Sequence, residues 1–209
     1  MDTVAERLAA WAEAEEARFL GRLEDEAPCS GWIAEYWRIV GEAAGRPHYR
    51  HVDGRTVDAE GERWAWSAAF VGAGVWAATG GAGWFAYCEW HSTYVRDAMR
   101  RAAAGGDQPY RAFPIDALPP RRGDLVVQWR AGIGDGAPDR PVTWRTAPRL
   151  DPFTSHGDIV VRVADGVAEI VGGNLADTVQ RRRLALAPDG RLRDTAQARG
   201  HWFALIRFA

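Results

Sequence analysis

Apolar residues in the first half of the chain recur at helical spacing. They return every three or four positions among glutamate and arginine residues, as in amphipathic helices. This pattern predicts helices over residues 3–24, 31–44, 67–79 and 90–103. The third segment, S-A-A-F-V-G-A-G-V-W-A-A-T, is small and apolar on nearly every side, and Gly80 and Gly81 follow it as a stop signal. We therefore expect a central buried helix that packs closely against a sheet.

The hydrophobic pattern becomes strand-like after residue 123. Short apolar runs predict strands at 124–129, 158–163, 168–171, 181–187 and 202–208. Asp165-Gly166 is a strong hairpin signal, and Asp189-Gly190 is the turn expected between the last two strands. Segments 46–63, 104–122 and 131–153 are expected to be connections. Helices followed by an antiparallel sheet predict an α+β fold.

Composition limits the classes of protein that fit. The chain has 209 residues, which suits one large domain or a domain with an extension. Its formal net charge of -2 argues against general nucleic-acid binding. No stretch approaches 18 apolar residues, so no membrane span is expected. The acidic start Met1-Asp2-Thr3 lacks the features of a secretory signal. The chain is thus expected to be cytoplasmic, exported by a non-classical route, or supplied already trimmed.

Cysteine and tryptophan usage leave two questions open. Cys29 and Cys88 form no C-x-x-C pair, which argues against a structural zinc site, while one disulfide between them remains an alternative. The 11 tryptophans suit core packing, and aromatic rings also line sugar grooves.

Three segments carry candidate chemistry. Ser67 begins the predicted buried helix, whose N-terminal N–H groups and partial positive charge would stabilise an anionic nucleophile and an oxyanion. His156 enters a strand and is a candidate general base. Asn174 follows the next strand and could hold the other imidazole nitrogen. These three residues are our predicted catalytic set.

Each member of this set also has a purely structural explanation. Serine is a favoured helix N-cap, so Ser67 could serve only as a cap. His156 could be an ordinary loop histidine with satisfied hydrogen bonds, and Asn174 after two glycines could be a turn residue. Spacing alone therefore leaves the catalytic and the structural explanation open for each of the three residues.

Other polar residues extend the candidate site. Asp158 lies two residues after His156, so both side chains would point to one face of a strand, and we include Asp158 as an auxiliary catalytic residue. Zinc bound by His91, His156 and Asp158 is an alternative that no known ligand spacing supports, and we expect no cofactor. Cys88 is the other candidate nucleophile. The predicted substrate-binding residues are Trp64, Trp66, Trp90, His91 and Trp144.

Several motifs resemble those of bacterial cell-wall amidases and endopeptidases of the NlpC and CHAP type. R-W-A-W-S-A-A-F-V-G is similar to their W-C-A-A-F-V segment, and R-R-G-D-L-V-V to their P-G-D-L strand opening. S-H-G-D-I-V-V resembles the strand that carries their histidine, and V-G-G-N the strand with their third polar residue. The resemblance implies a papain-like fold over residues 31–209, with residues 1–30 as a helical extension.

A closer resemblance is to domain of unknown function 2272. Its members share E-Y-W, W-S-A-A-F-V, H-S-x-Y, G-D-L, S-H-x-D-I-V and G-G-N, which occur here in that order over roughly residues 31–208. Ser67 stands where the NlpC and CHAP enzymes carry cysteine. Because a serine hydroxyl is far less acidic than a thiol, Ser67 would have to lose its proton as it attacks.

The resemblance implies hydrolysis of an amide bond in peptidoglycan or a related peptide by a Ser-His-Asn arrangement. The first alternative is an inactive module that binds the cell wall or a protein partner. The second is an antibacterial toxin delivered to a neighbour's cell wall.

Overall fold

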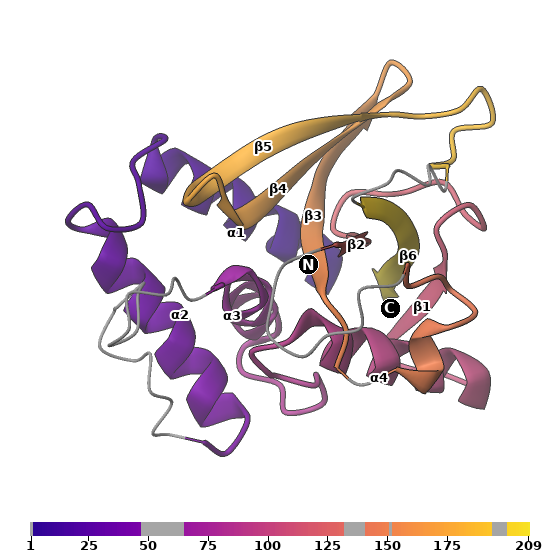
Figure 1. The fold of residues 1–209 in the computed structure, drawn as a ribbon, viewed down its shortest axis with the longest axis horizontal. Coiled ribbons are helices and arrows are strands. Elements are labelled where there is room, and N and C mark those ends of the chain that lie inside the picture. The colour runs from indigo at the N-terminus through magenta and orange to yellow at the C-terminus, as the bar shows by residue number, and fades with distance from the viewer. Residues whose placement is uncertain (1, 47–64, 132–140, 151, 194–199) are drawn as a thin grey trace.

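The computed structural model describes residues 2–46, 65–131, 141–150, 152–193 and 200–209. Over these residues, helices pack against an antiparallel sheet (Figure 1), which confirms the predicted α+β class. The helices are α1 (Val4–Phe19), α2 (Cys29–Ala43), α3 (Ser67–Thr79) and α4 (His91–Ala104), with a short 3-10 helix at Ala147–Arg149. The strands are β1 (Tyr110–Pro114), β2 (Leu125–Arg130), β3 (Ser155–Ala164), β4 (Val167–Leu175), β5 (Thr178–Ala185) and β6 (Gly200–Phe208).

The six strands lie in the order β1-β6-β2-β3-β4-β5. The predicted β3–β4 hairpin is confirmed, because Asp165 and Gly166 both have the positive φ that a tight two-residue hairpin requires. A turn forms at Gly190 after β5, as predicted, and β6 then lies between β1 and β2 and does not pair with β5. Strand β1 was missed because it lies in the segment rich in glycine and proline.

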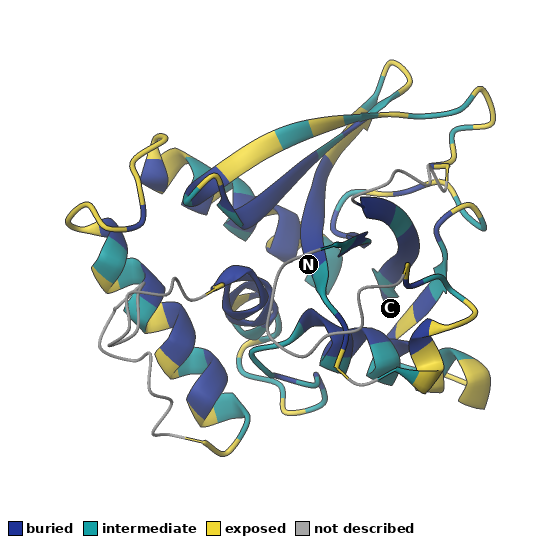
Figure 2. Ribbon diagram, in the orientation of Figure 1, coloured by how far each residue is buried: buried dark blue, intermediate teal, exposed yellow. Residues whose placement is uncertain are grey.

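Helix α3 forms the centre of the helical layer. Its bounds agree with the prediction, and most of its residues are buried (Figure 2). A Cβ at Gly72 would lie 2.6 Å from Val40 of α2, and one at Gly74 would lie 2.6 Å from the Trp11 ring of α1. The small residues therefore let both neighbouring helices approach α3 closely.

Helix α1 is shorter than predicted and is part of the main core. Leu20 adopts a left-handed conformation and ends the helix after Phe19, whereas the prediction ran to residue 24. Leu8 and Phe19 are fully buried in the cluster that contains the α3 side chains. The domain boundary at residue 30 stays a prediction. Among the described helices, none is long and apolar enough to cross a membrane.

The sheet has two differently occupied faces. Val127, Ile159 and Val171 belong to the main core, under the helices. The opposite face holds a smaller cluster made by Ile115, Val126, Val160, Ile170, Leu192 and Leu205. Because strand side chains alternate between the two faces, the residues of each cluster indicate to which face a neighbouring polar side chain of the sheet points.

Candidate functional site

Ser67 is the first residue of α3, and Trp66 occupies the N-cap position. The N-cap alternative for Ser67 is therefore wrong. The side chain is buried, with 7 % of the residue exposed. Its Oγ lies 2.7 Å from Nε2 of His91, which is the first residue of α4. Two helix N-termini thus bring a hydroxyl and an imidazole into hydrogen-bond contact.

The second nitrogen of the same imidazole contacts a tyrosine. Nδ1 of His91 lies 2.5 Å from the hydroxyl oxygen of Tyr94, three residues further along α4. Residues three apart face the same side of a helix, so α4 itself aligns this pair. Both residues are buried. The result is a continuous row, Ser67–His91–Tyr94.

The sequence assigned the contact with Ser67 to His156, but the imidazole in that contact is His91. His91 was predicted as a substrate-binding residue and, in one alternative, as a zinc ligand, and Tyr94 was missed as a functional residue. The signal that would have found Tyr94 is the H-S-x-Y spacing on a predicted helix. His156 lies nearby, with its ring centroid 5.5 Å from that of His91.

His156 belongs to a second polar row on β3. Its Nε2 lies 3.2 Å from Oδ1 of Asp158, and Arg182 Nη2 of β5 donates to the other carboxylate oxygen. Asp158 is fully buried. Burial acts to raise the pKa of this carboxyl, but His156 and the Arg182 guanidinium outweigh it and lower the pKa to about 2. Asp158 is therefore a buried carboxylate that is ionised at neutral pH.

Asn174 does not hold the His156 ring as predicted. Within the described residues its side chain makes no hydrogen bond, and Asp158 is the partner of His156 Nε2. Asn174 has a φ of 57°, a left-handed conformation that asparagine tolerates better than most residues. This position fits the turn-residue explanation, because the pairing of β4 and β5 shifts register between Gly172 and Leu175.

Two glycines let these polar side chains lie directly on the sheet. A Cβ at Gly157 would overlap the Tyr94 hydroxyl and lie 3.1 Å from Nδ1 of His91. A Cβ at Gly172 would overlap the Asp158 carboxylate and lie 3.0 Å from Nε2 of His156. Both rows of polar side chains therefore require glycine at these two positions.

The predicted wall residues occupy different environments. Trp66 is fully buried, and its Nε1 donates to Glu24 Oε2 at 2.6 Å, so its assignment to the substrate-binding wall is wrong. Trp90 is half-buried at the N-cap of α4, next to His91. Trp144 is half-buried against the main core. Trp64 lies outside the described residues.

The alternative chemistries receive little support from the geometry. Cys29 and Cys88 are both free thiols, and Cys88 Sγ contacts Glu89 at 3.6 Å instead of His91. Among the described residues, no group of three or more histidine, cysteine, aspartate or glutamate side chains is placed to hold a metal ion.

Burial keeps the His91 imidazole neutral. Removal from water, together with the neighbouring His156, lowers the pKa of His91 well below its ordinary value of 6.5, although Asp158 acts in the opposite direction. A neutral imidazole has one donor and one acceptor nitrogen. When Nδ1–H donates to the Tyr94 oxygen, Nε2 is free to accept the Ser67 proton. The Tyr94 hydroxyl can also donate to Nδ1, and Nε2–H then donates to Ser67.

The lowered pKa makes stability depend on pH. Unfolded His91 binds a proton below about pH 6.5, whereas the buried His91 of the folded chain resists protonation. The contribution of the neutral His91 to the free energy of unfolding is therefore complete above that pH and is lost as the pH falls. Asp158, with its lowered pKa, loses its contribution only below about pH 4. We expect the free energy of unfolding to fall between about pH 6.5 and about pH 4.5, with a His91 contribution of up to about 1.4 kcal/mol per pH unit.

Urea unfolding of the wild type and His91→Gln at pH 7, 6 and 5 measures this slope. The variant should show a flatter pH dependence, because glutamine does not titrate. Equal slopes in the two proteins would contradict a neutral buried His91.

Fold and site together define an α+β protein in which a helix-terminal serine contacts an imidazole. The chain belongs to the uncharacterized protein family conserved in bacteria, DUF2272, whose model matches residues 10–208. No curated protein and no solved structure matches the chain.

Proposed function

We propose that this protein hydrolyses an amide bond in peptidoglycan or a related peptide, with Ser67 as nucleophile and His91 as general base. One observation carries the proposal: the 2.7 Å contact between Ser67 Oγ and His91 Nε2 at the start of a buried helix. This distance lies within the range for proton transfer between a nucleophile and its base.

The reaction would proceed through an acyl-enzyme. Ser67 Oγ attacks the substrate carbonyl carbon while its proton passes to His91 Nε2. Among the described residues, no side chain caps the N-terminus of α3, so backbone N–H groups of its first turn can stabilise the oxyanion. The C–N bond then breaks, and His91 returns the proton to the leaving amine. Water, deprotonated by the same imidazole, hydrolyses the ester and regenerates Ser67.

The neighbouring groups support the base. When Tyr94 accepts from Nδ1–H, the imidazole is in the tautomer whose Nε2 is unprotonated and can accept the Ser67 proton. The Asp158 carboxylate favours the imidazolium that forms during attack, because its negative charge acts on His91 through a buried environment. In this mechanism His156 positions Asp158 through their 3.2 Å contact, and it takes no proton from Ser67.

The substrate class rests on the resemblance to NlpC and CHAP enzymes. W-S-A-A-F-V places Ser67 at the position of their cysteine, and S-H-G-D-I-V-V resembles the strand with their base. The departure is that His91, from α4, takes the base position beside the nucleophile.

A module that only binds peptidoglycan or a protein is the second candidate. The observation that favours it is the burial of Ser67, since 7 % exposure leaves a substrate carbonyl little access to Oγ. A hydroxyl hydrogen-bonded inside a core can also be purely structural.

Incubation of the purified wild-type protein with peptidoglycan fragments tests the proposal. We expect new amino groups and shorter fragments, detected by mass spectrometry, with heat-unfolded protein as the blank. Sedimentation with insoluble peptidoglycan measures binding in parallel. Binding without fragment release would support the second candidate, and neither binding nor release would contradict both the peptidoglycan hydrolase and the peptidoglycan-binding module.

A further inference from the structure

Glu24 is a buried carboxylate in the connection between α1 and α2. Only 1 % of the residue is exposed, and its Oε2 accepts a hydrogen bond from the indole Nε1 of Trp66 at 2.6 Å. Glutamate is rarely buried to this extent, because its polar atoms lose their contact with water, whereas an apolar side chain would fill the same space without that cost. Core packing alone therefore does not account for a glutamate at this position.

Trp66 connects this carboxylate to the nucleophile. It occupies the N-cap position of α3, directly before Ser67. The backbone oxygen of Trp66 accepts from the N–H of Phe70 at 3.0 Å, so Trp66 begins the hydrogen-bond pattern of the helix. Within the described chain its side chain makes no capping hydrogen bond. The placement of the first turn of α3 thus depends on how the Trp66 ring is held.

Aromatic packing and one hydrogen bond hold the Trp66 ring. Phe19 stacks on it at a centroid distance of 5.9 Å, and the centroids of Tyr36 and Phe70 lie at 6.2 and 6.4 Å. Apolar burial is non-directional, whereas a hydrogen bond weakens steeply when its angle changes. The bond from Nε1–H to Glu24 therefore sets the rotation of the indole inside this aromatic cluster.

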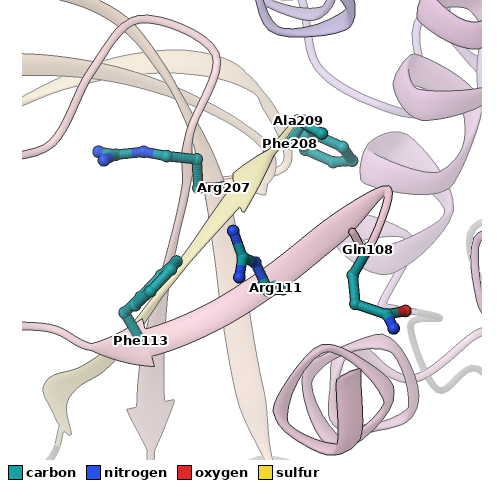
Figure 3. Close-up of a pocket in the computed structure, with 6 residues that line it drawn as sticks. All are labelled: Gln108, Arg111, Phe113, Arg207, Phe208 and Ala209. Carbon is teal, nitrogen blue, oxygen red and sulfur yellow. The ribbon is translucent and has the colours of Figure 1, made fainter. Parts of the chain in front are cut away.

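The backbone around Glu24 is itself attached to the sheet. The Glu24 N–H donates to the backbone oxygen of Asp177 at 2.7 Å, and the Thr178 hydroxyl donates to the backbone oxygen of Arg22 at 2.6 Å. These contacts lie at the start of the edge strand β5. The pocket of about 200 Å³ beside β1 lies at the other edge of the sheet and is not lined by Glu24 or Trp66 (Figure 3). The carboxylate is thus carried on a fixed support.

We infer that Glu24 is a positioning residue for the nucleophile, which holds Ser67 in contact with His91 by fixing the Trp66 indole. The inference rests on the proposed function, in which the 2.7 Å separation of Ser67 Oγ and His91 Nε2 is the reacting contact. A displacement of about 1 Å at such a contact can lower a rate by about a hundredfold. On this inference the segment 1–30, expected as an extension, supplies part of the support of the catalytic pair.

Two substitutions of Glu24 test the role of its hydrogen bond. Glu24→Leu removes the acceptor, whereas Glu24→Gln keeps an oxygen that can accept from the indole. We expect Glu24→Leu to lower kcat on soluble peptidoglycan fragments about tenfold to a hundredfold with KM unchanged, because Glu24 acts on Ser67 through Trp66. Glu24→Gln should restore most of the lost rate.

Glu15→Leu is the matched control. Glu15 is also a buried glutamate, and it accepts from the hydroxyl of Tyr36, which lies within α2 and is not adjacent to Ser67. Loss of this bond should lower the urea midpoint and leave kcat close to the wild-type value. A purely structural role of Glu24 would give the same result for both leucine variants.

The His91 ring provides a readout that needs no enzymatic activity. Its ring ¹⁵N resonances in NMR respond to the hydrogen bond at Nε2, and Ser67→Ala shows their positions without that bond. Glu24→Leu should move the Nε2 resonance toward its position in Ser67→Ala, whereas Glu24→Gln and Glu15→Leu should leave it in place. An unmoved resonance in Glu24→Leu, or an equal movement in Glu15→Leu, would overturn the inference. A wild-type protein without hydrolytic activity would contradict the proposed function instead, and the resonance would still decide whether Glu24 positions Ser67.

Discussion

Ser67→Ala is expected to reduce amide hydrolysis by at least about a thousandfold, to the level of the blank. The substitution removes the atom that attacks the substrate, while alanine fits the helix position. Fragment release from peptidoglycan measures the loss. Ser92→Ala is a matched control, since Ser92 is a buried serine next to His91 whose Oγ makes no hydrogen bond with the described residues. That variant should keep wild-type activity.

Histidine variants separate the two candidate bases. His91→Gln should lower the rate by about a hundredfold to ten-thousandfold, the usual contribution of a general base. His156→Gln should have a smaller effect, because its ring contacts Asp158 and not Ser67. Circular dichroism and urea unfolding confirm that each variant is folded.

The opposite order of effects would show that His156 is the base and that the Ser67–His91 contact is structural. A Ser67→Ala variant as active as the wild type would contradict the nucleophile itself. Ser67→Cys adds a further readout, since a thiol at this position is expected to remain nucleophilic.

The fold could be predicted where local patterns determine structure. Helix α3 has the predicted bounds because its glycine stop and its apolar run are local signals. The β3–β4 hairpin follows from Asp165-Gly166 in the same way. Strand β1 and the place of β6 could not be predicted, because both depend on the long-range pairing of Tyr110–Pro114 with a strand about 90 residues later.

The sequence predicted which residues lie in the site better than it predicted which of them contact one another. Ser67, His156 and Asp158 all lie in or beside the polar rows, but no local pattern indicated how deeply His91 is buried. The i,i+3 spacing of His91 and Tyr94 was visible, yet only packing of α4 beside α3 turns that spacing into a contact with Ser67. For Trp66 the error is the opposite one. It was expected in the wall of a substrate site, but it is a core residue that donates a hydrogen bond to Glu24.

Gly172→Ala is expected to destabilise the protein by about 3 kcal/mol, at the upper end of what overpacking a core costs. The added methyl would overlap the Asp158 carboxylate, which cannot retreat because it is fully buried and bound by His156 and Arg182. Urea unfolding measures the loss as a lower midpoint with an unchanged slope.

Gly31→Ala provides the matched control for the same chemical change. Gly31 lies on the exposed side of α2, and a Cβ at this position would meet no atom within 4 Å. Alanine should therefore stabilise the helix by about 0.5–1 kcal/mol. Combining Gly172→Ala with Asp158→Ala removes the overlapping carboxylate, and the double variant should be destabilised by less than the sum of the two single variants. If the losses in free energy of unfolding of the two single variants simply add, Gly172 is required for its backbone conformation alone. The close approach of the Asp158–His156 row to β4 would then not explain the destabilisation by Gly172→Ala.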